Sequence, residues 1–334
     1  MTFDDLLAHN PLCRLLGIRY PICQAGMFQV AYGRLAAAVS AAGGLGVIGS
    51  AYMSGAQLRE EIRIVKNETD APFGVDILFA RVSDADAASQ QYTDQVKEAI
   101  DVTFAEGAPV LVSGLGDPTA VVPAARAAGM TVMALVGTSR QAARVVNGGV
   151  DAVIASGHDG GGHVGRIGTS VLVPKVVDAV NVPVVAAGGL VDGRGLVAAL
   201  ALGAAGVWMG TRFIATDEAR AHANYKRRIV EIDEDGTVVT RCHSGKPNRM
   251  IRNDFTRAWE GREAEIKPYP HQMIEVGNPA SVLGRIEGDV DNGVLPAGQG
   301  AGLIGSVAGA GEVVGAIVEE ARAVFDRWQE QAGA

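Results

Sequence analysis

The chain of 334 residues is long enough for one large α/β barrel with an appendage, or for two domains of ordinary size. Apolar residues make up 48% of it and charged residues 20%, which excludes a disordered or fibrous protein because there is ample material for a packed core. A net charge of −8, with no basic cluster longer than Lys226-Arg227-Arg228, argues against a nucleic-acid partner.

A repeated pattern predicts eight parallel strands before Thr211. Five copies consist of a helical segment, a glycine that ends it, a short apolar run and then small or polar residues. Three further apolar runs complete the series. In chain order we expect strands within residues 21–26, 41–50, 73–79, 106–114, 127–137, 147–157, 182–189 and 201–211, and helices within 32–42, 55–66, 90–106, 118–128, 139–146, 170–180 and 193–202.

Eight strand–helix units in about 190 residues is the number expected of a TIM barrel, a closed (β/α)8 barrel. A doubly wound sheet is the alternative, but it would normally have fewer strands and a reversal of strand order. The predicted fold class is therefore α/β, a TIM barrel with a smaller inserted lid domain.

The pattern changes after the eighth strand. Residues 217–235 are charged and helical, 237–243 are typical of a strand, 249–265 are rich in ions, and prolines then interrupt the chain at two places. Apolar residues recur at helical spacing over 312–331. We expect a barrel over 1–217, an inserted lid that contacts the substrate over 218–295, and a C-terminal return over 296–334 that packs on the barrel.

Glycines and polar residues follow the predicted strands, at the end of a barrel where catalysis takes place. Gly188 and Gly189 follow the seventh strand, and Met209, Gly210 and Thr211 end the eighth. These are the two places at which barrels bind phosphate through backbone N–H groups and a helix N-terminus. The alternative is that the glycines only make tight turns. We expect a phosphate-bearing ligand at these two loops.

The loop over residues 156–166, after the sixth strand, contains three consecutive glycines and two histidines, His158 and His163. Such a loop can wrap a flat ligand and present an imidazole that acts as a base near neutral pH. A solvated surface loop is the plain alternative. The two histidines have no third metal ligand nearby in the sequence, so we expect no metal site.

Three other features carry less information. Asp76 lies inside an apolar strand, where a carboxylate without a partner is costly, and this favours a functional role. Cys23 ends the first strand, but no neighbour in the sequence would activate its thiol, so we expect core packing. The G-x-G-x-x-G run from Gly300 to Gly305 lacks the preceding strand of a dinucleotide site and predicts only close backbone packing.

The sequence also indicates a compartment. No stretch reaches the roughly 18 uncharged apolar residues of a membrane span, and the N-terminus lacks the cationic start of a secretory signal. The three cysteines are an odd number without paired metal-ligand spacing. We therefore expect a soluble, cytoplasmic protein with no disulfide framework and no membrane partner.

Several segments, in order along nearly the whole chain, resemble one known family. They are PICQAGM, AGGLGVIGS, PFGVDI, the loop that ends in GGGH, VPVVAAGGLVDGRG, MGTRFIAT, SGKPNRMIRN and AGQGAGLI. Together they resemble the FMN-dependent nitronate monooxygenases (2-nitropropane dioxygenases), a group that also contains FMN-dependent enoyl-ACP reductases and NADH:quinone reductases.

The resemblance implies that FMN lies at the barrel mouth and that His163 is the catalytic residue. The cofactor-binding positions that it implies are Gln24, Ala25, Gly26, Met27, Asp76, Ser156, Gly161, Ala187, Gly188, Gly189, Met209, Gly210, Thr211 and Gln299. Two positions depart from the family pattern, because Asp76 stands where most members have Asn and Trp208 replaces a common Gln. A carboxylate near the ring would disfavour an anionic reduced flavin or would itself be protonated.

The first function that the resemblance implies is a nitronate monooxygenase, which oxidises alkyl nitronates with O2 to carbonyl compounds and nitrite. The alternative is an NAD(P)H-dependent FMN reductase or dehydrogenase that acts on an enoyl or other acyl thioester, or on a quinone, with NAD(P)H as a transient co-substrate. A third possible function, from another class, is a proton transfer without redox chemistry, in which the barrel binds a phosphorylated metabolite. A small-molecule substrate is expected in each case, and a homodimer is a candidate assembly.

Overall fold

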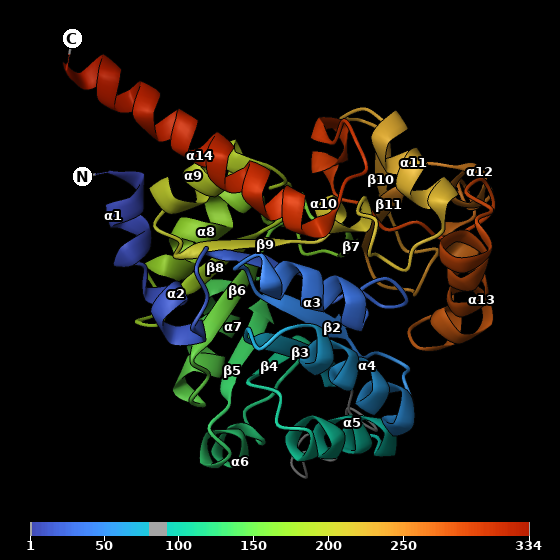
Figure 1. Cartoon of the computed structure of the whole chain (residues 1–334). Helices are drawn as coiled ribbons and strands as arrows, with labels where there is room; N and C mark the ends of the chain where they lie inside the picture. Colours follow the sequence, from blue (N-terminus) through green and yellow to red (C-terminus); the bar gives the residue numbers. More distant parts are fainter. Residues whose placement is uncertain (1, 80–91, 334) are drawn as a thin grey trace.

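Eight parallel strands form the centre of the molecule in the computed structural model, which describes residues 2–79 and 92–333 (Figure 1). Their order around the sheet is β1-β9-β8-β6-β5-β4-β3-β2, and a bridge between Cys23 and Leu45 brings the two ends of the sheet together. The predicted TIM barrel is therefore confirmed. The barrel strands are β1 (Ile22–Gln24), β2 (Gly46–Gly49), β3 (Phe73–Phe79), β4 (Val110–Gly116), β5 (Thr131–Val136), β6 (Ala152–Ser156), β8 (Val184–Ala187) and β9 (Gly206–Met209).

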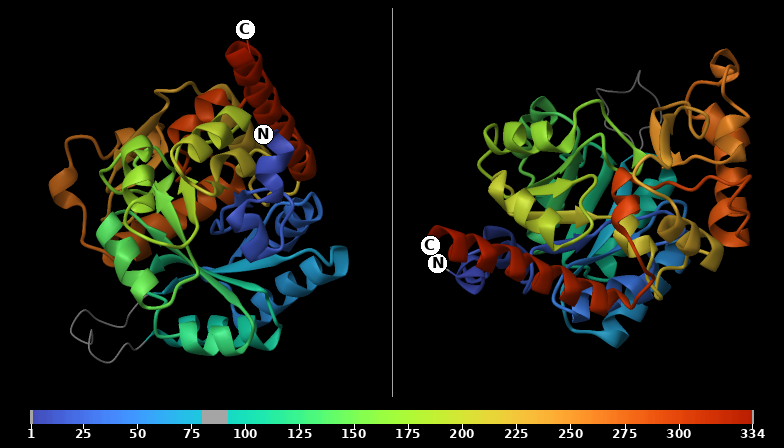
Figure 2. Two further views of the ribbon diagram at one scale, coloured as in Figure 1. Left: turned by 90° about the vertical axis from the view of Figure 1, so that its left-hand side faces the viewer. Right: turned by 90° about the horizontal axis from the view of Figure 1, so that it is seen from above.

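Helices connect successive strands and surround the barrel (Figure 2). The predicted helix start at Gln90 lies outside the described residues, and the helix begins at Asp94 in the structure. The helices up to the end of the barrel are α1 (Phe3–Ala8), α2 (Pro11–Leu16), α3 (Gly33–Ala41), α4 (Gly55–Glu68), α5 (Asp94–Ala105), α6 (Val122–Ala127), α7 (Ser139–Asn147), α8 (Thr169–Val177), α9 (Gly193–Ala201) and α10 (Thr211–Ile214).

The five repeated segments show why these residues alternate between helix and strand. In each one a glycine just after the helix has a φ between 61° and 96°, a left-handed conformation that ends the helix and turns the chain into the next strand. Polar side chains cap the other ends; for example, Oδ1 of Asp192 accepts the N–H of Gly195 at 2.9 Å at the start of α9. The glycines that end the helices are Gly43, Gly107, Gly129, Gly149 and Gly203.

Side chains alternate along the barrel strands between two apolar layers. One layer lies between the strands and the helices and includes Val75 and Ile77 of β3. The other fills the barrel and includes Trp208 of β9 together with Leu12 of α2. Because successive side chains of a strand point to opposite faces, Asp76, between Val75 and Ile77, points into the barrel. Burial of these two layers provides most of the driving force for the fold.

The chain after β9 contains α11 (Ala223–Glu231), β10 (Thr237–Thr240), β11 (Asn248–Ile251), α12 (Asp254–Arg257) and α13 (Asn278–Val282). Figures 1 and 2 show these elements together beside one end of the barrel. The strand β11 pairs with β10 and also with β7 (Gly162–His163), the short strand in the glycine loop after β6. This three-stranded antiparallel sheet ties the later segment to the glycine loop.

The last helix, α14 (Ala310–Gly333), packs against α9 and α3 on the outside of the barrel. Its apolar residues Val314, Ile317 and Ala321 are buried there. Arg322 pairs with Asp4 of α1 at 2.6 Å, so the two ends of the chain lie side by side. Among the described residues, no helix combines the length and the apolar character needed to cross a membrane.

Candidate active site

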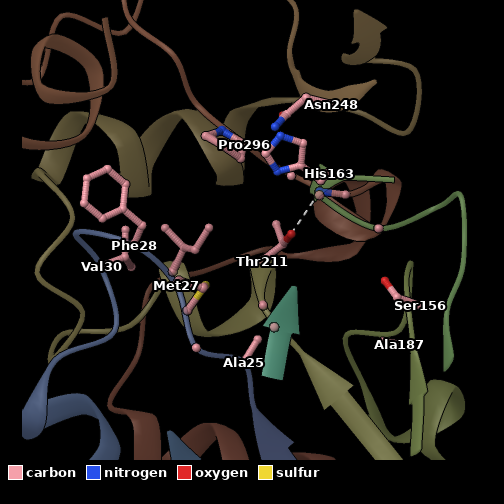
Figure 3. Close-up of a pocket in the computed structure, with 18 of the residues that line it drawn as sticks. Ala25, Met27, Phe28, Val30, Ser156, His163, Ala187, Thr211, Asn248 and Pro296 are labelled. Carbon is pink, nitrogen blue, oxygen red and sulfur yellow. Dashed lines mark hydrogen bonds between the residues drawn. The ribbon is translucent and has the colours of Figure 1, made fainter. Parts of the chain in front are cut away.

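A pocket of about 310 Å³ lies at the carboxyl ends of the barrel strands (Figure 3). Its walls come from the residues that end or follow β1, β3, β4, β6, β8 and β9, and from the chain between α11 and residue 300. This is the end of the barrel at which the sequence predicted a ligand. The predicted site residues that line the pocket are Ala25, Gly26, Met27, Asp76, Ser156, Gly161, His163, Ala187, Gly188, Gly189, Gly210 and Thr211.

Three predicted site residues do not line this pocket. The side chain of Gln24 is fully buried and bonds to both backbone groups of Val47, at 3.1 and 3.0 Å, so it helps to close the barrel between β1 and β2. Met209 belongs to the apolar layer beneath the helices. Gln299 has an exposed side chain, while its backbone N–H donates to the carbonyl of Asp159 at 3.0 Å. Strand alternation explains the first two, since their neighbours Ala25 and Gly210 line the pocket instead.

One wall of the pocket is made of backbone. Gly188 and Gly189 have φ values of 108° and 73°, which only glycine adopts readily. A Cβ atom at Gly161 would lie 2.7 Å from the carbonyl carbon of Ala297, so that loop also requires glycine. Within the part of the chain that the structure describes, the N–H groups of Gly189 and Gly210 donate no hydrogen bond. These groups are therefore free to bind an anion.

Asp76 is a buried carboxyl group in the same wall. Glycines flank it, and a Cβ atom at Gly114 would lie 2.5 Å from its Oδ1, which has no hydrogen-bond partner among the described residues. Burial raises the pKa of Asp76 to about 8, while the backbone N–H of Gly114 acts in the opposite direction. The carboxyl group is therefore mostly neutral at pH 7 and can both donate and accept a hydrogen bond.

His163 faces the backbone wall from β7. The pairing of β7 with β11 sets it opposite Asn248, and its Nε2 lies 2.8 Å from Oγ of Ser244. Its Nδ1 makes no hydrogen bond to any described residue, and this nitrogen is available to a substrate. Figure 3 shows the ring between Thr211 and Asn248. Ser244 thus fixes the orientation of an imidazole that borders the pocket.

A second imidazole lies behind the first. The ring of His243 is buried, with its centre 6.1 Å from that of His163. The Asn248 amide donates to its Nδ1 at 3.1 Å, and its Nε2 lies 3.2 Å from Oγ of Ser281, which itself donates to a carbonyl. These partners place the proton of His243 on Nε2. Burial lowers the pKa of His243 well below its ordinary value.

The same effects keep His163 neutral. The pocket leaves part of its ring in contact with solvent, but protein surrounds the other sides, and this desolvation is the main cause that lowers its pKa to about 4. The positive charges of Lys246 and Arg285 lower the pKa further. At physiological pH the site therefore offers an uncharged imidazole that can accept a proton or a hydrogen bond.

The other sequence features have structural roles or lie elsewhere. His158 does not line the pocket, and its Nδ1 lies 2.7 Å from the carbonyl oxygen of Gly165. Cys23 is buried, and burial raises the pKa of its thiol. A Cβ atom at Gly300 would lie 2.7 Å from the carbonyl oxygen of Gly189, so this glycine run packs against the backbone wall as predicted. The described residues contain no group of three side chains that could hold a metal ion.

Several residues that line the pocket or support its lining were not identified from the sequence as site residues. Ser244 and Asn248 lie in the SGKPNRMIRN segment, so a signal existed, but the sequence did not assign them a role. His243 precedes that segment, and nothing nearby distinguishes it from a scattered histidine. Arg285 lines the pocket from the chain after α13, and no local pattern marks it.

Comparison with known proteins identifies the family. A family model described as nitronate monooxygenase matches residues 9–320. A protein of Mycobacterium tuberculosis named (3aS,4S,5R,7aS)-5-hydroxy-7a-methyl-1-oxo-octahydro-1H-indene-4-carboxyl-CoA dehydrogenase is 34% identical over 93% of this chain and 96% of its own. A probable nitronate monooxygenase of Staphylococcus saprophyticus is 37% identical over 77% of this chain and 82% of its own.

The fold gives the same result. The solved structure of FabK from Thermotoga maritima superposes with a TM-score of 0.88 and 37% sequence identity, and the match covers 97% of this chain and 99% of FabK. The family match extends over the barrel, the later segment and the first part of α14, up to residue 320, so it includes both walls of the pocket. The chain therefore belongs to the nitronate monooxygenase family and is an oxidoreductase.

Proposed function

We propose that this protein is an FMN-dependent nitronate monooxygenase, which oxidises alkyl nitronates with O2 to carbonyl compounds and nitrite. The observation that carries the proposal is that a neutral imidazole, His163, faces the same pocket as the free N–H groups of Gly189 and Gly210. One side of the pocket can thus hold a phosphorylated cofactor, while the other presents a group that accepts a proton or a hydrogen bond. The family match supports this assignment.

The backbone wall fits FMN. Gly189, Gly210 and Thr211 would hold its single phosphate, and the glycine loop with Gly161 leaves room for a flat ring. The unpartnered Oδ1 of Asp76 offers a ring edge a polar contact that no described residue satisfies. When bound, FMN supplies the electron-transfer chemistry that these side chains lack.

The opposite wall fits the substrate. Ser244 holds Nε2 of His163, so Nδ1 can orient the oxygen atoms of a nitronate or accept the α-proton of a neutral nitroalkane. An imidazole with a pKa of about 4 is a weak base, which suits a substrate that arrives already ionised. Phe28, Val30 and Leu78 give the pocket an apolar surface for the alkyl group.

Anaerobic mixing tests the proposal. The purified protein is mixed with ethylnitronate in the absence of oxygen while the flavin absorbance is followed, and then O2 is admitted and nitrite is measured. We expect bleaching by the nitronate alone, followed by release of nitrite. A flavin that ethylnitronate leaves oxidised would contradict the proposal.

One observation favours a second candidate, an NAD(P)H-dependent reductase or dehydrogenase of an acyl thioester. Tyr52 and Tyr269 line the pocket and are 48% and 38% exposed, so the pocket mouth offers a broad apolar surface for a large substrate. The relative that is named as a CoA-thioester dehydrogenase covers 93% of the chain. Bleaching by NADH or NADPH, with none by ethylnitronate, would favour this candidate.

A further inference from the structure

Arg285 is a buried cation on the substrate side of the pocket. Its side chain lines the pocket, yet the residue is only 6% exposed. Its Nη1 donates to the carbonyl of Phe28 at 3.1 Å, its Nε lies 3.5 Å from the carbonyl of Val294, and its guanidinium lies 5.5 Å from the centre of the Phe28 ring. These contacts hold the guanidinium in place, but none of them provides a negative charge to balance its positive charge.

No carboxylate of residues 2–79 or 92–333 forms an ion pair with Arg285. Arginine stays protonated in proteins, so the charge persists despite its burial. The ionisable groups nearest to it add no negative charge: Tyr225 donates its hydroxyl to a carbonyl, and His163 and His243 are neutral. A buried charge without a partner destabilises the folded protein, which points to a functional reason for keeping Arg285 at this position.

Arg285 lies on the Phe28 side of the pocket. Figure 3 shows Phe28 and Val30 on one side of the pocket and Ser156 and Ala187 on the other, with His163 and Thr211 between them. Arg285 is hydrogen-bonded to the backbone carbonyl of Phe28. The guanidinium is therefore on the Phe28 side of the pocket, and its positive charge reaches His163.

We propose that Arg285 is the residue that binds the negative charge of the substrate, and that its guanidinium holds a planar oxyanion group such as that of a nitronate. Nη1 and Nε of Arg285 donate to the two backbone carbonyls, and its Nη2 makes no hydrogen bond to a described residue, so the planar guanidinium keeps N–H donors for the oxygen atoms of an anion. The inference rests on the proposed function only in taking the ligand to be the substrate of the oxidoreductase. Arg285 is thus a specificity-determining residue, while His163 orients the bound substrate through its Nδ1.

Nitrate is the probe, because it is a planar oxyanion that cannot turn over as a nitronate. Its binding to the purified, flavin-containing protein is measured by calorimetry at constant ionic strength, with sodium chloride as the reference salt. We expect saturable binding of nitrate that is at least about tenfold tighter than binding of neutral nitromethane, since a buried cation favours the charged ligand. Equal or tighter binding of nitromethane would overturn the proposal on the unmodified protein.

Variants of the protein test whether Arg285 supplies the positive charge that binds nitrate. Arg285→Gln keeps a donor for the Phe28 carbonyl but removes the charge, and it should weaken nitrate binding by about 30-fold or more, whereas Arg285→Lys should retain most of it. Lys246→Met is the matched control, because Lys246 is the exposed cation whose charge also reaches His163, and it should change binding by less than about threefold. Nitrate binding that survives Arg285→Gln, or that is lost with Lys246→Met, would overturn the proposal.

Two further readouts separate this inference from its alternatives. Loss of flavin from Arg285→Gln would show that the guanidinium serves the cofactor, which contradicts the proposal. If ethylnitronate reduces the flavin but nitrate binding does not depend on Arg285, the inference fails while the proposed function stands. If nitrate binding depends on Arg285 but nitronates are not oxidised, the proposed function fails and the anion preference stands.

Discussion

The two walls of the pocket are built by different means. The barrel wall consists mainly of backbone, with Gly188, Gly189 and Gly210 at the ends of adjacent strands. The opposite wall consists of side chains, among them His163 and Arg285, which are held by hydrogen bonds between distant parts of the chain. A backbone wall can hold one phosphate whatever the substrate is, so we expect substrate choice to depend on the side-chain wall.

Asp76 is the exception in this comparison, a buried side chain in the backbone wall. In the unfolded chain a carboxyl group ionises near pH 3.8, whereas burial in the folded protein raises the pKa of Asp76 to about 8. Between these values the folded state holds a proton that the unfolded state has lost. The stability that this neutral carboxyl contributes is therefore fully present below pH 3.8 and is lost as the pH rises towards 8.

Asp76→Asn should remove that loss, because the amide is neutral at every pH. At about 1.4 kcal/mol per pKa unit, the shift sets an upper limit of about 5 kcal/mol for the gain in free energy of unfolding at pH 8. Urea unfolding of both proteins at pH 5 and pH 8 measures the part of this gain that develops between these two pH values. If the difference in stability between the variant and the parent is the same at both pH values, Asp76 is not held neutral by the fold.

His163 tests the side-chain wall. His163→Ala should lower turnover by about 10²- to 10⁴-fold, the usual contribution of a general acid or base, while the flavin stays bound to the backbone wall. His158→Ala is the control, because His158 bonds to the Gly165 carbonyl outside the pocket. Steady-state kinetics and the flavin spectrum of each variant give both readouts. Near-normal turnover of His163→Ala would reduce His163 to a part of the pocket wall.

Gly210 tests the backbone wall. A Cβ atom there would lie 3.6 Å from Sδ of Met27 and 3.7 Å from Cβ of Ala25, which is ordinary contact, so Gly210→Val should fold. Its branched side chain would fill space next to the free N–H group, and we expect flavin binding to weaken by about 10- to 100-fold. Flavin content after dialysis measures this.

Gly168→Val is the matched control, because Gly168 has open space around it and does not line the pocket. A folded Gly210→Val protein that retains all of its flavin would show that this loop is not part of the phosphate site.

The pH dependence of turnover gives the smallest expected change. Because burial lowers the pKa of His163 to about 4, its imidazole is already neutral at pH 5.5 and stays neutral at pH 8. We expect no acid limb from His163 in the kcat/KM profile over this range, and a fall only as the pH approaches 4. An inflection near pH 6.5 that disappears in His163→Ala would contradict the neutral-imidazole account.

The difference between the two walls also explains which features could be predicted from the sequence. The strands and the glycine loops depend on local patterns, and these predicted the barrel and the position of its ligand-binding end. It was harder to predict which of two neighbouring residues faces the pocket. Gln24 and Met209 point away from it, while Ala25 and Gly210 line it. Strand alternation decides this, and it requires the exact strand register.

The side-chain wall depends on contacts over long sequence separations. His163 and Ser244 are 81 residues apart, and Arg285 and Phe28 are 257 apart. No local pattern encodes such a contact, so Arg285 could not be distinguished from a surface arginine before the fold was known. His163 could be assigned from the resemblance because it lies within a short local motif. The segment that begins at Ser244 also resembles the family, but the resemblance alone gave Ser244 no role.

The most direct test of the account is the identity of the bound cofactor. The protein is purified, denatured by heat, and the released compound is identified by its mass and quantified against the chain. A backbone wall that offers one phosphate site, without a strand–helix G-x-G-x-x-G unit for an adenosine diphosphate half, predicts FMN at about one per chain. Recovery of FAD, or of a colourless protein that takes up no added FMN, would contradict it.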